Sequence, residues 1–110
     1  MSYQHKDLAA GRWSRLPFFE QMAHIGSEVA RALNWQKKNN SAYCRQAAER
    51  ALELMDLTLE NVKDFARLKE LARARENLAD YFFGTNEHRS TEAALKNYFL
   101  IFNDAARKHL

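Results

Sequence analysis

The sequence contains little cysteine, proline or glycine, and each shortage excludes a class of structure. One proline and three glycines in 110 residues leave little material for the many tight turns of an all-β fold. The single cysteine, Cys44, cannot form an internal disulfide, so nothing in the fold depends on an oxidising compartment. No stretch approaches the roughly 18 consecutive apolar residues of a membrane span, and the first residues lack the apolar run of a signal peptide. We therefore expect a cytoplasmic protein without a membrane-spanning segment.

The charged residues show no concentration of one sign. Seventeen Lys and Arg residues and fourteen Asp and Glu residues give a net charge of +3, and both signs are interspersed along the chain. A nucleic-acid-binding protein usually gathers its excess positive charge on one face. The pattern favours a mixed, solvated surface, so we do not expect nucleic acid as a partner.

The sequence does contain four amphipathic segments of about 20 residues each, 17–34, 41–59, 62–83 and 90–109. In all four, apolar residues recur at spacings of three and four, the period of an α-helix that buries one face. Short connections between the segments require sequential helices to run antiparallel. The sequence therefore predicts an all-α fold, an up-down-up-down antiparallel four-helix bundle. Residues 14–110 would form this single domain, after a flexible lead-in over 1–13.

Particular residues mark the expected helix ends and the core. Ser41 and either Ser90 or Thr91 have side chains preferred at helix N-caps, and Gly84 is a natural stop for the third helix. Gly26 costs a helix about 1 kcal/mol relative to alanine, which indicates that it allows a neighbouring helix to approach closely. The aromatic residues that we expect in the core are Phe18, Phe65, Phe82, Phe99 and Phe102.

One charged residue interrupts an apolar face. The third segment runs through Leu71, Arg75 and Leu78, so an arginine stands where a leucine is expected. A buried guanidinium is costly without a carboxylate partner, and the expected partners are Glu53 and Asp56 in the second helix. One interpretation is an internal ion pair, or an arginine that extends to the edge of the bundle. The other is a pocket for an anion or phosphate between helices.

The sequence carries no motif for catalysis or metal binding. Its four histidines are scattered, and the Glu-x-x-His pattern of di-iron bundles is absent. Glu20 and His24, four residues apart, permit either a metal-ligand pair or an ordinary contact on one helix face. Cys44 has no histidine near it in sequence and is expected to be a buried, inert thiol. We therefore expect no catalytic residue, no metal and no cofactor, and a non-enzymatic function.

Several large apolar residues lie outside the main apolar faces. Such a surplus is typical of a protein–protein interface, which favours self-association as a homodimer or contact with a partner protein. The alternative is that Phe19 and Phe83 cover the ends of the bundle while the lead-in, with Trp13, covers the rest. The interface candidates are Phe19, Tyr81, Phe83, Leu100 and Ile101.

Two resemblances add expectations. The runs PFFEQMA at 17–23, RALELMDLT at 50–58 and DYF at 80–82 resemble those of small bacterial four-helix proteins to which no activity is assigned. The arrangement of helices is also similar to that of HEPN domains, which implies pairing with a nucleotidyltransferase or action as a ribonuclease. HEPN ribonucleases use an arginine followed four to six residues later by a histidine, and this chain has no such pair. The resemblance implies, as an alternative function, an RNA-associated or toxin–antitoxin component without that motif.

Overall fold

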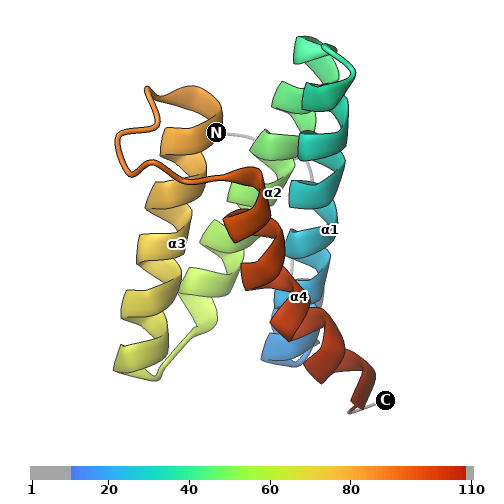
Figure 1. Cartoon of the computed structure of the whole chain (residues 1–110). Coiled ribbons are helices and arrows are strands. Elements are labelled where there is room, and N and C mark those ends of the chain that lie inside the picture. Colours follow the sequence, from blue (N-terminus) through green and yellow to red (C-terminus); the bar gives the residue numbers. More distant parts are fainter. Residues whose placement is uncertain (1–10, 109–110) are drawn as a thin grey trace.

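The computed structural model describes residues 11–108, which contain helices and no strand (Figure 1). Its four α-helices are α1 (Phe18–Lys37), α2 (Ser41–Asn61), α3 (Phe65–Phe83) and α4 (Glu92–Lys108), and a short 3₁₀-helix, η2 (Trp13–Arg15), precedes them. The all-α class is thus confirmed, and each helix matches one of the four predicted segments to within a few residues. Most of the predicted lead-in, residues 1–10, and the predicted helix end at 109 lie outside the described residues.

Side-chain caps explain where three of the helices begin. The Asn40 side chain accepts a hydrogen bond of 3.0 Å from the Tyr43 backbone, so Asn40 caps α2 and the prediction of Ser41 as the cap is wrong by one residue. Asp64 caps α3 by accepting from the Ala66 backbone at 3.1 Å, which explains why this helix begins later than the period indicates. Thr91 accepts from the Ala94 backbone at 3.1 Å and stands as expected before α4.

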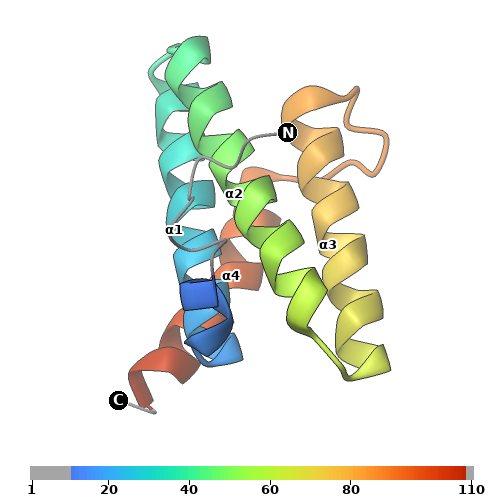
Figure 2. The ribbon, with the colours of Figure 1, turned by 180° about the vertical axis from the view of Figure 1, so that it is seen from behind.

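The helices pack in a specific set of pairs. α1 packs against both α2 and α4, and α2 packs against α3 (Figures 1 and 2). The end of α1 lies beside the start of α2, where the Trp35 and Tyr43 rings are 4.9 Å apart, and beside the start of α4, where Lys37 Nζ is 2.8 Å from Glu92. Within the described residues, the backbones of α3 and α4 stay farther apart than those of the other packed pairs, and the two helices meet through side chains such as Leu71 and Tyr98. Each of these two helices therefore keeps one side that the other does not cover.

The core lies between α1 and α2, where the apolar faces of both helices meet the inner residues of α3 and α4. Large side chains fill most of it, and a group of alanines lets α1 and α2 approach closely at the other end. The largest fully buried side chains are Trp13, Met22, Ile25, Leu33, Met55, Leu71, Leu78, Val29 and Thr58.

Trp13 belongs to this core, although the sequence analysis assigned it to the lead-in. Its side chain is only 2% exposed, and its indole N–H donates a hydrogen bond of 2.9 Å to Thr58 Oγ1 on α2. Gln21 Nε2 in turn donates to the Trp13 carbonyl at 2.9 Å. A buried ring with a satisfied donor anchors η2 to both α1 and α2, so the folded unit includes this residue.

The prediction that Phe65 is buried is wrong, because its side chain is 76% exposed. The buried face of α3 runs through Leu71 and Leu78. Phe65 precedes Leu71 by six residues, which places it about 120° away from that face at 3.6 residues per turn. Phe65 matches the spacing of three and four residues to its nearest apolar neighbours in the sequence. As the first residue of α3, however, it lies off the face of this helix that α2 covers.

Candidate functional site

The arginine in the apolar face of α3 forms an ion pair with α2. Arg75 Nε donates to Asp56 Oδ1 at 2.5 Å and Arg75 Nη2 donates to Asp56 Oδ2 at 3.2 Å. Both side chains are partly open to solvent, at 35% and 39% exposure, so Arg75 reaches the edge of the α2–α3 contact. The other candidate partner, Glu53, is not part of this pair. With two of its three guanidinium nitrogens on one carboxylate, Arg75 joins two helices, and Asp56 partly neutralises the charge that an anion would need.

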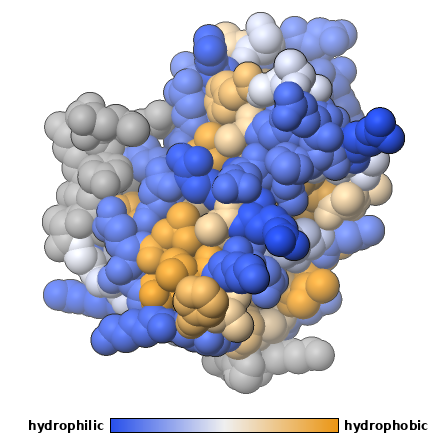
Figure 3. Space-filling model, turned by 90° about the vertical axis from the view of Figure 1, so that its left-hand side faces the viewer, coloured by the Kyte–Doolittle hydropathy of each residue, from blue (hydrophilic) through white to orange (hydrophobic). Residues whose placement is uncertain are grey.

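The five interface candidates do not form one surface. Leu100 and Ile101 are adjacent on α4 and are 53% and 69% exposed. Phe83 is 41% exposed but lies at the end of α3, where the guanidinium of Arg45 stands 5.8 Å from the centre of its ring. On the side of the molecule that carries α3, Figure 3 likewise shows hydrophobic patches separated by hydrophilic side chains. The exposed apolar residues therefore belong to separate places.

Phe19 and Tyr81 are half-buried and make contacts inside the molecule. The Tyr81 hydroxyl donates to Gln36 Oε1 on α1 at 3.0 Å, and burial, before any nearby charge, raises the pKa of this phenol. The Phe19 ring lies 6.0 Å from Phe18 and 6.4 Å from Phe102. These contacts link α1 with α3 and with α4, which leaves Leu100, Ile101 and Phe83 as the exposed members of the predicted set.

An apolar groove of about 240 Å³ runs between α1 and α4 beside Leu100. Its floor lies where Gly26 meets Phe99, and α1 contributes the small side chains of Ala23, Ser27 and Ala30 to its wall. Small residues on one helix leave room for the side chain of a further helix to enter. The groove and Leu100 together give α4 an apolar edge that residues 11–108 do not cover.

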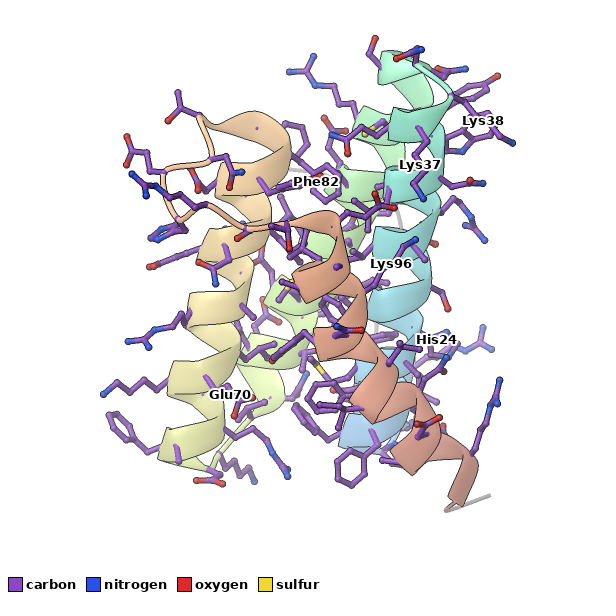
Figure 4. All side chains as sticks on the ribbon, viewed as in Figure 1. His24, Lys37, Lys38, Glu70, Phe82 and Lys96 are labelled. Carbon is purple, nitrogen blue, oxygen red and sulfur yellow. The ribbon has the colours of Figure 1, made fainter. Side chains whose placement is uncertain are left out.

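Charged residues fix the position of α4 on α1 above this groove. Glu92 forms ion pairs with two lysines, with Lys37 Nζ at 2.8 Å and Lys96 Nζ at 3.0 Å. Figure 4 labels both lysines. Hydrogen bonding to Lys37 is the largest of the effects that lower the pKa of Glu92, and the same contact raises the pKa of Lys37. These pairs are open to solvent, so they orient α4 more than they stabilise it.

Cys44 and His24, the residues with nucleophilic or metal-binding side chains weighed in the sequence, lie in ordinary surroundings. Burial raises the pKa of the half-buried Cys44 thiol, which keeps it protonated and a poor nucleophile. His24 is exposed and its ring lies 5.8 Å from Trp13, an ordinary contact. Among residues 11–108, no three His, Cys, Asp or Glu side chains converge as metal ligands. None of the helices in this range combines the length and apolar character needed to cross a lipid bilayer.

A second group of residues, which sequence reasoning did not single out as a site, lies where α1, α3 and α4 meet. We call it the aromatic cluster: Phe18, Phe19, Tyr98 and Phe102, with Arg67 and Glu70 of α3 beside them. These residues and Leu71 line a cavity of about 120 Å³. The adjacent pair Phe18 and Phe19 and the spacing of Tyr98 and Phe102 were visible in the sequence. The approach of Arg67 to them was not, because it depends on how α3 lies across the bundle.

Comparison with protein-family models, with curated proteins and with solved structures finds no match for this chain. The resemblances to small bacterial four-helix proteins and to HEPN domains therefore stay predictions. Two places among the described residues have geometry that bears on function, the outer side of α4 and the aromatic cluster.

Proposed function

We propose that this chain is a non-enzymatic helical module that acts by protein–protein association, as a homodimer that forms through the outer face of α4. We define this face by Leu100 and Ile101 with the flanking Lys96 and Asp104. The proposal includes the up-down-up-down arrangement of the bundle, which is supported by the contacts that place the start of one helix beside the end of its neighbour. The adjacent exposure of Leu100 and Ile101 beside an apolar groove is the observation that carries the proposal.

The outer face of α4 is turned away from the core. The inner face of this helix carries Leu95 and Phe99, both buried. Leu100 follows Leu95 by five residues, which places it about 140° away around the helix. Burying a leucine or isoleucine side chain fully is worth about 1.5–3 kcal/mol. Two such residues side by side, next to a groove, offer more to a partner than Phe65 or Phe83, which stand singly at opposite ends of α3.

Charge spacing on α4 favours a second copy of this chain as the partner. Lys96 lies four residues before Leu100 and Asp104 lies four residues after it. If two α4 helices cross antiparallel with Leu100 at the two-fold axis, Lys96 of one copy meets Asp104 of the other, and the pair occurs twice. Asp104 takes part in no ion pair within the described part of the chain, so its carboxylate remains available for this contact.

The expected dimer is weak. α4 has 17 residues and is therefore about 26 Å long, so a contact along one of its faces falls short of the roughly 800 Å² per partner of a stable interface. The walls of the α1–α4 groove add area to this contact. We expect dissociation constants of about 10 μM or higher, and the dimer should be sought at concentrations well above that.

Sedimentation equilibrium between 10 μM and 1 mM would test the proposal. Leu100→Asp should abolish the concentration-dependent increase in mass. Phe65→Asp is the matched control, because Phe65 is even more exposed but lies on α3, and it should leave the association unchanged. An equal loss in both variants would indicate general hydrophobic adhesion and would contradict the proposal, as would a wild type that stays strictly monomeric at 1 mM.

A charge exchange tests the antiparallel register. Asp104→Lys alone places lysine opposite Lys96 and should weaken the dimer, as should Lys96→Glu alone, which places glutamate opposite Asp104. The double variant, Lys96→Glu with Asp104→Lys, reverses both pairs and should recover most of the association. Thermal unfolding of each variant shows whether the bundle is intact, since Lys96→Glu also removes a contact with Glu92. A double variant no stronger than the single ones would rule out this register.

A further inference from the structure

The aromatic cluster presents several ring faces and edges to one small cavity. The Phe18 ring meets Phe102 nearly edge to face, with centroids 5.9 Å apart and planes inclined by 84°. Tyr98 lies 5.4 Å from Phe102 on the same helix, and the buried Leu71 closes the cavity from α3. Its volume of about 120 Å³ exceeds the roughly 30 Å³ that one water molecule occupies in the liquid. The cavity therefore has room for a ligand of several heavy atoms.

A cation already lies over these rings. The guanidinium carbon of Arg67 is 4.1 Å from the centre of the Phe18 ring and 5.9 Å from that of Phe19. Arg67 forms no ion pair within residues 11–107, so cation–π contact with the aromatic rings is the main interaction that holds its guanidinium. The negative face of an aromatic ring attracts positive charge, and groups of such rings bind quaternary ammonium ions.

A carboxylate stands at the edge of the same cavity. Glu70 lies on the side of α3 that faces α4 (Figure 4), and in the described part of the chain it forms no ion pair. Glu70 is also close to Tyr98. Burial first, and then the charge and hydrogen bonding of Glu70, raise the pKa of the Tyr98 phenol to about 12. Tyr98 is therefore neutral at physiological pH, and the negative charge at this edge comes from Glu70, while Arg67 supplies a positive charge on the same cavity.

We propose that this cavity binds a small alkylated ammonium cation, and that Arg67 is an internal competitor for the same ring faces. The rings supply cation–π attraction for the methyl-bearing nitrogen, and Glu70 supplies an opposite charge that lacks a cationic partner. Glu70 would repel an anion, and the positive charge of Arg67 is already placed over the Phe18 ring. Removing the Arg67 guanidinium would free the Phe18 face and remove a like charge.

Comparing choline with its neutral isostere 3,3-dimethylbutan-1-ol distinguishes a cation-binding site from an apolar cavity of the same shape. Both would be titrated to about 50 mM against labelled full-length protein, with amide and aromatic chemical shifts followed by NMR. We expect choline, and not the alcohol, to shift signals of Phe18 and Tyr98. Arg67→Ala should bind choline at least about threefold more tightly than the wild type, because the competing cation is gone. Arg73→Ala, another exposed arginine of α3, is the matched control and should not change the affinity.

Glu70→Gln tests the carboxylate without changing the size of the side chain. It should weaken choline binding about threefold or more in the Arg67→Ala background, while the alcohol titration stays unchanged. Because Glu70 is exposed, the variant should fold normally, and its thermal unfolding checks this. Equal shifts with the alcohol, no choline binding by Arg67→Ala at 50 mM, or an unchanged affinity in Glu70→Gln would each overturn the proposal. None of these results depends on the α4 dimer, which Leu100→Asp tests separately.

Discussion

Gly26 of α1 lies directly against Phe99 of α4, so close that a Cβ atom built on Gly26 would stand 2.8 Å from the Cβ of Phe99. That Cβ is attached to the α4 backbone and cannot rotate away, so any added methyl group must push the two helices apart. Close packing was the predicted role of this glycine, and the packing occurs where α1 and α4 cross.

Gly26→Ala should therefore destabilise the bundle, although alanine favours a helix by about 1 kcal/mol over glycine. Inserting a methyl group into a well-packed contact costs about 1–3 kcal/mol, and at this distance we expect the larger part of that range. Urea unfolding should show a net loss of about 1–2 kcal/mol. Ser27→Ala, at the exposed neighbouring position, should change the stability by no more than about 0.5 kcal/mol. A Gly26→Ala variant more stable than the wild type would contradict the close crossing.

Trp13 and Thr58 should show an energetic coupling. Thr58→Val removes the acceptor of the indole N–H and leaves this buried donor without a partner, which costs about 1–3 kcal/mol. Trp13→Phe removes the donor, so Thr58→Val should cost less by about 1 kcal/mol in that background. A double-mutant cycle by chemical denaturation measures the difference. If the two substitutions lowered the free energy of unfolding additively, this hydrogen bond would contribute nothing to the stability of the folded state.

The period of apolar residues was enough to predict four helices, because each one buries a single face over several turns. It could not predict the exceptions, since these depend on partners distant in sequence. Trp13 is buried because it packs into the core formed by α1 and α2, where Thr58 of α2 accepts a hydrogen bond from its indole N–H. Phe65 is exposed because α2 covers a face of α3 about 120° away from it. Asn40, rather than Ser41, caps α2 because the preceding turn sets which side chain reaches the free backbone donors.

Some features of the candidate sites could likewise be predicted from the sequence, and others depend on how the helices pack. The expectation that Arg75 meets a carboxylate followed from the cost of an unpaired charge, and Asp56 lay within the predicted pair of partners. Leu100 and Ile101 lie outside the face that continues through Leu95, so their exposure follows from the helical period. The aromatic cluster needs Phe18 and Arg67 to meet from two helices that do not follow each other in the chain. Contacts of that kind are decided by packing angles, which the sequence pattern alone does not contain.

The ion pair between Arg75 and Asp56 should contribute little to stability. Its side chains are about one-third exposed, and ion pairs open to solvent are typically worth about 0–1 kcal/mol. We expect Arg75→Met to lower the free energy of unfolding by no more than about 1 kcal/mol. We also expect added phosphate or sulfate at 10 mM to leave the melting temperature unchanged apart from the effect of ionic strength, with sodium chloride of equal ionic strength as the control. A stabilisation by phosphate that Arg75→Met removes would instead support the anion pocket.

Asp80 should make the stability of the α3–α4 connection depend on pH. Its two carboxylate oxygens accept hydrogen bonds from the Glu87 and His88 backbone, each 2.9 Å long. These bonds, that from His88 foremost, lower the pKa of Asp80 in the folded protein. A lowered folded pKa contributes stability that is present above the unfolded value, about 3.9, and is lost as the pH falls through the folded value. We therefore expect this contribution at pH 7 and its progressive loss as the pH falls below the unfolded value of about 3.9.

Asp80→Asn tests this directly, because asparagine keeps one acceptor oxygen but has no charge. The variant should melt at a lower temperature than the wild type at pH 7, and the difference should shrink as the pH falls toward 2.5. Glu76→Gln, an exposed position one turn earlier on α3, serves as the control and should show only a small difference at either pH. Melting curves followed by circular dichroism between pH 2.5 and 7 give both comparisons. If Asp80→Asn differs from the wild type equally at pH 7 and pH 2.5, the Asp80 carboxylate is not what orders this loop.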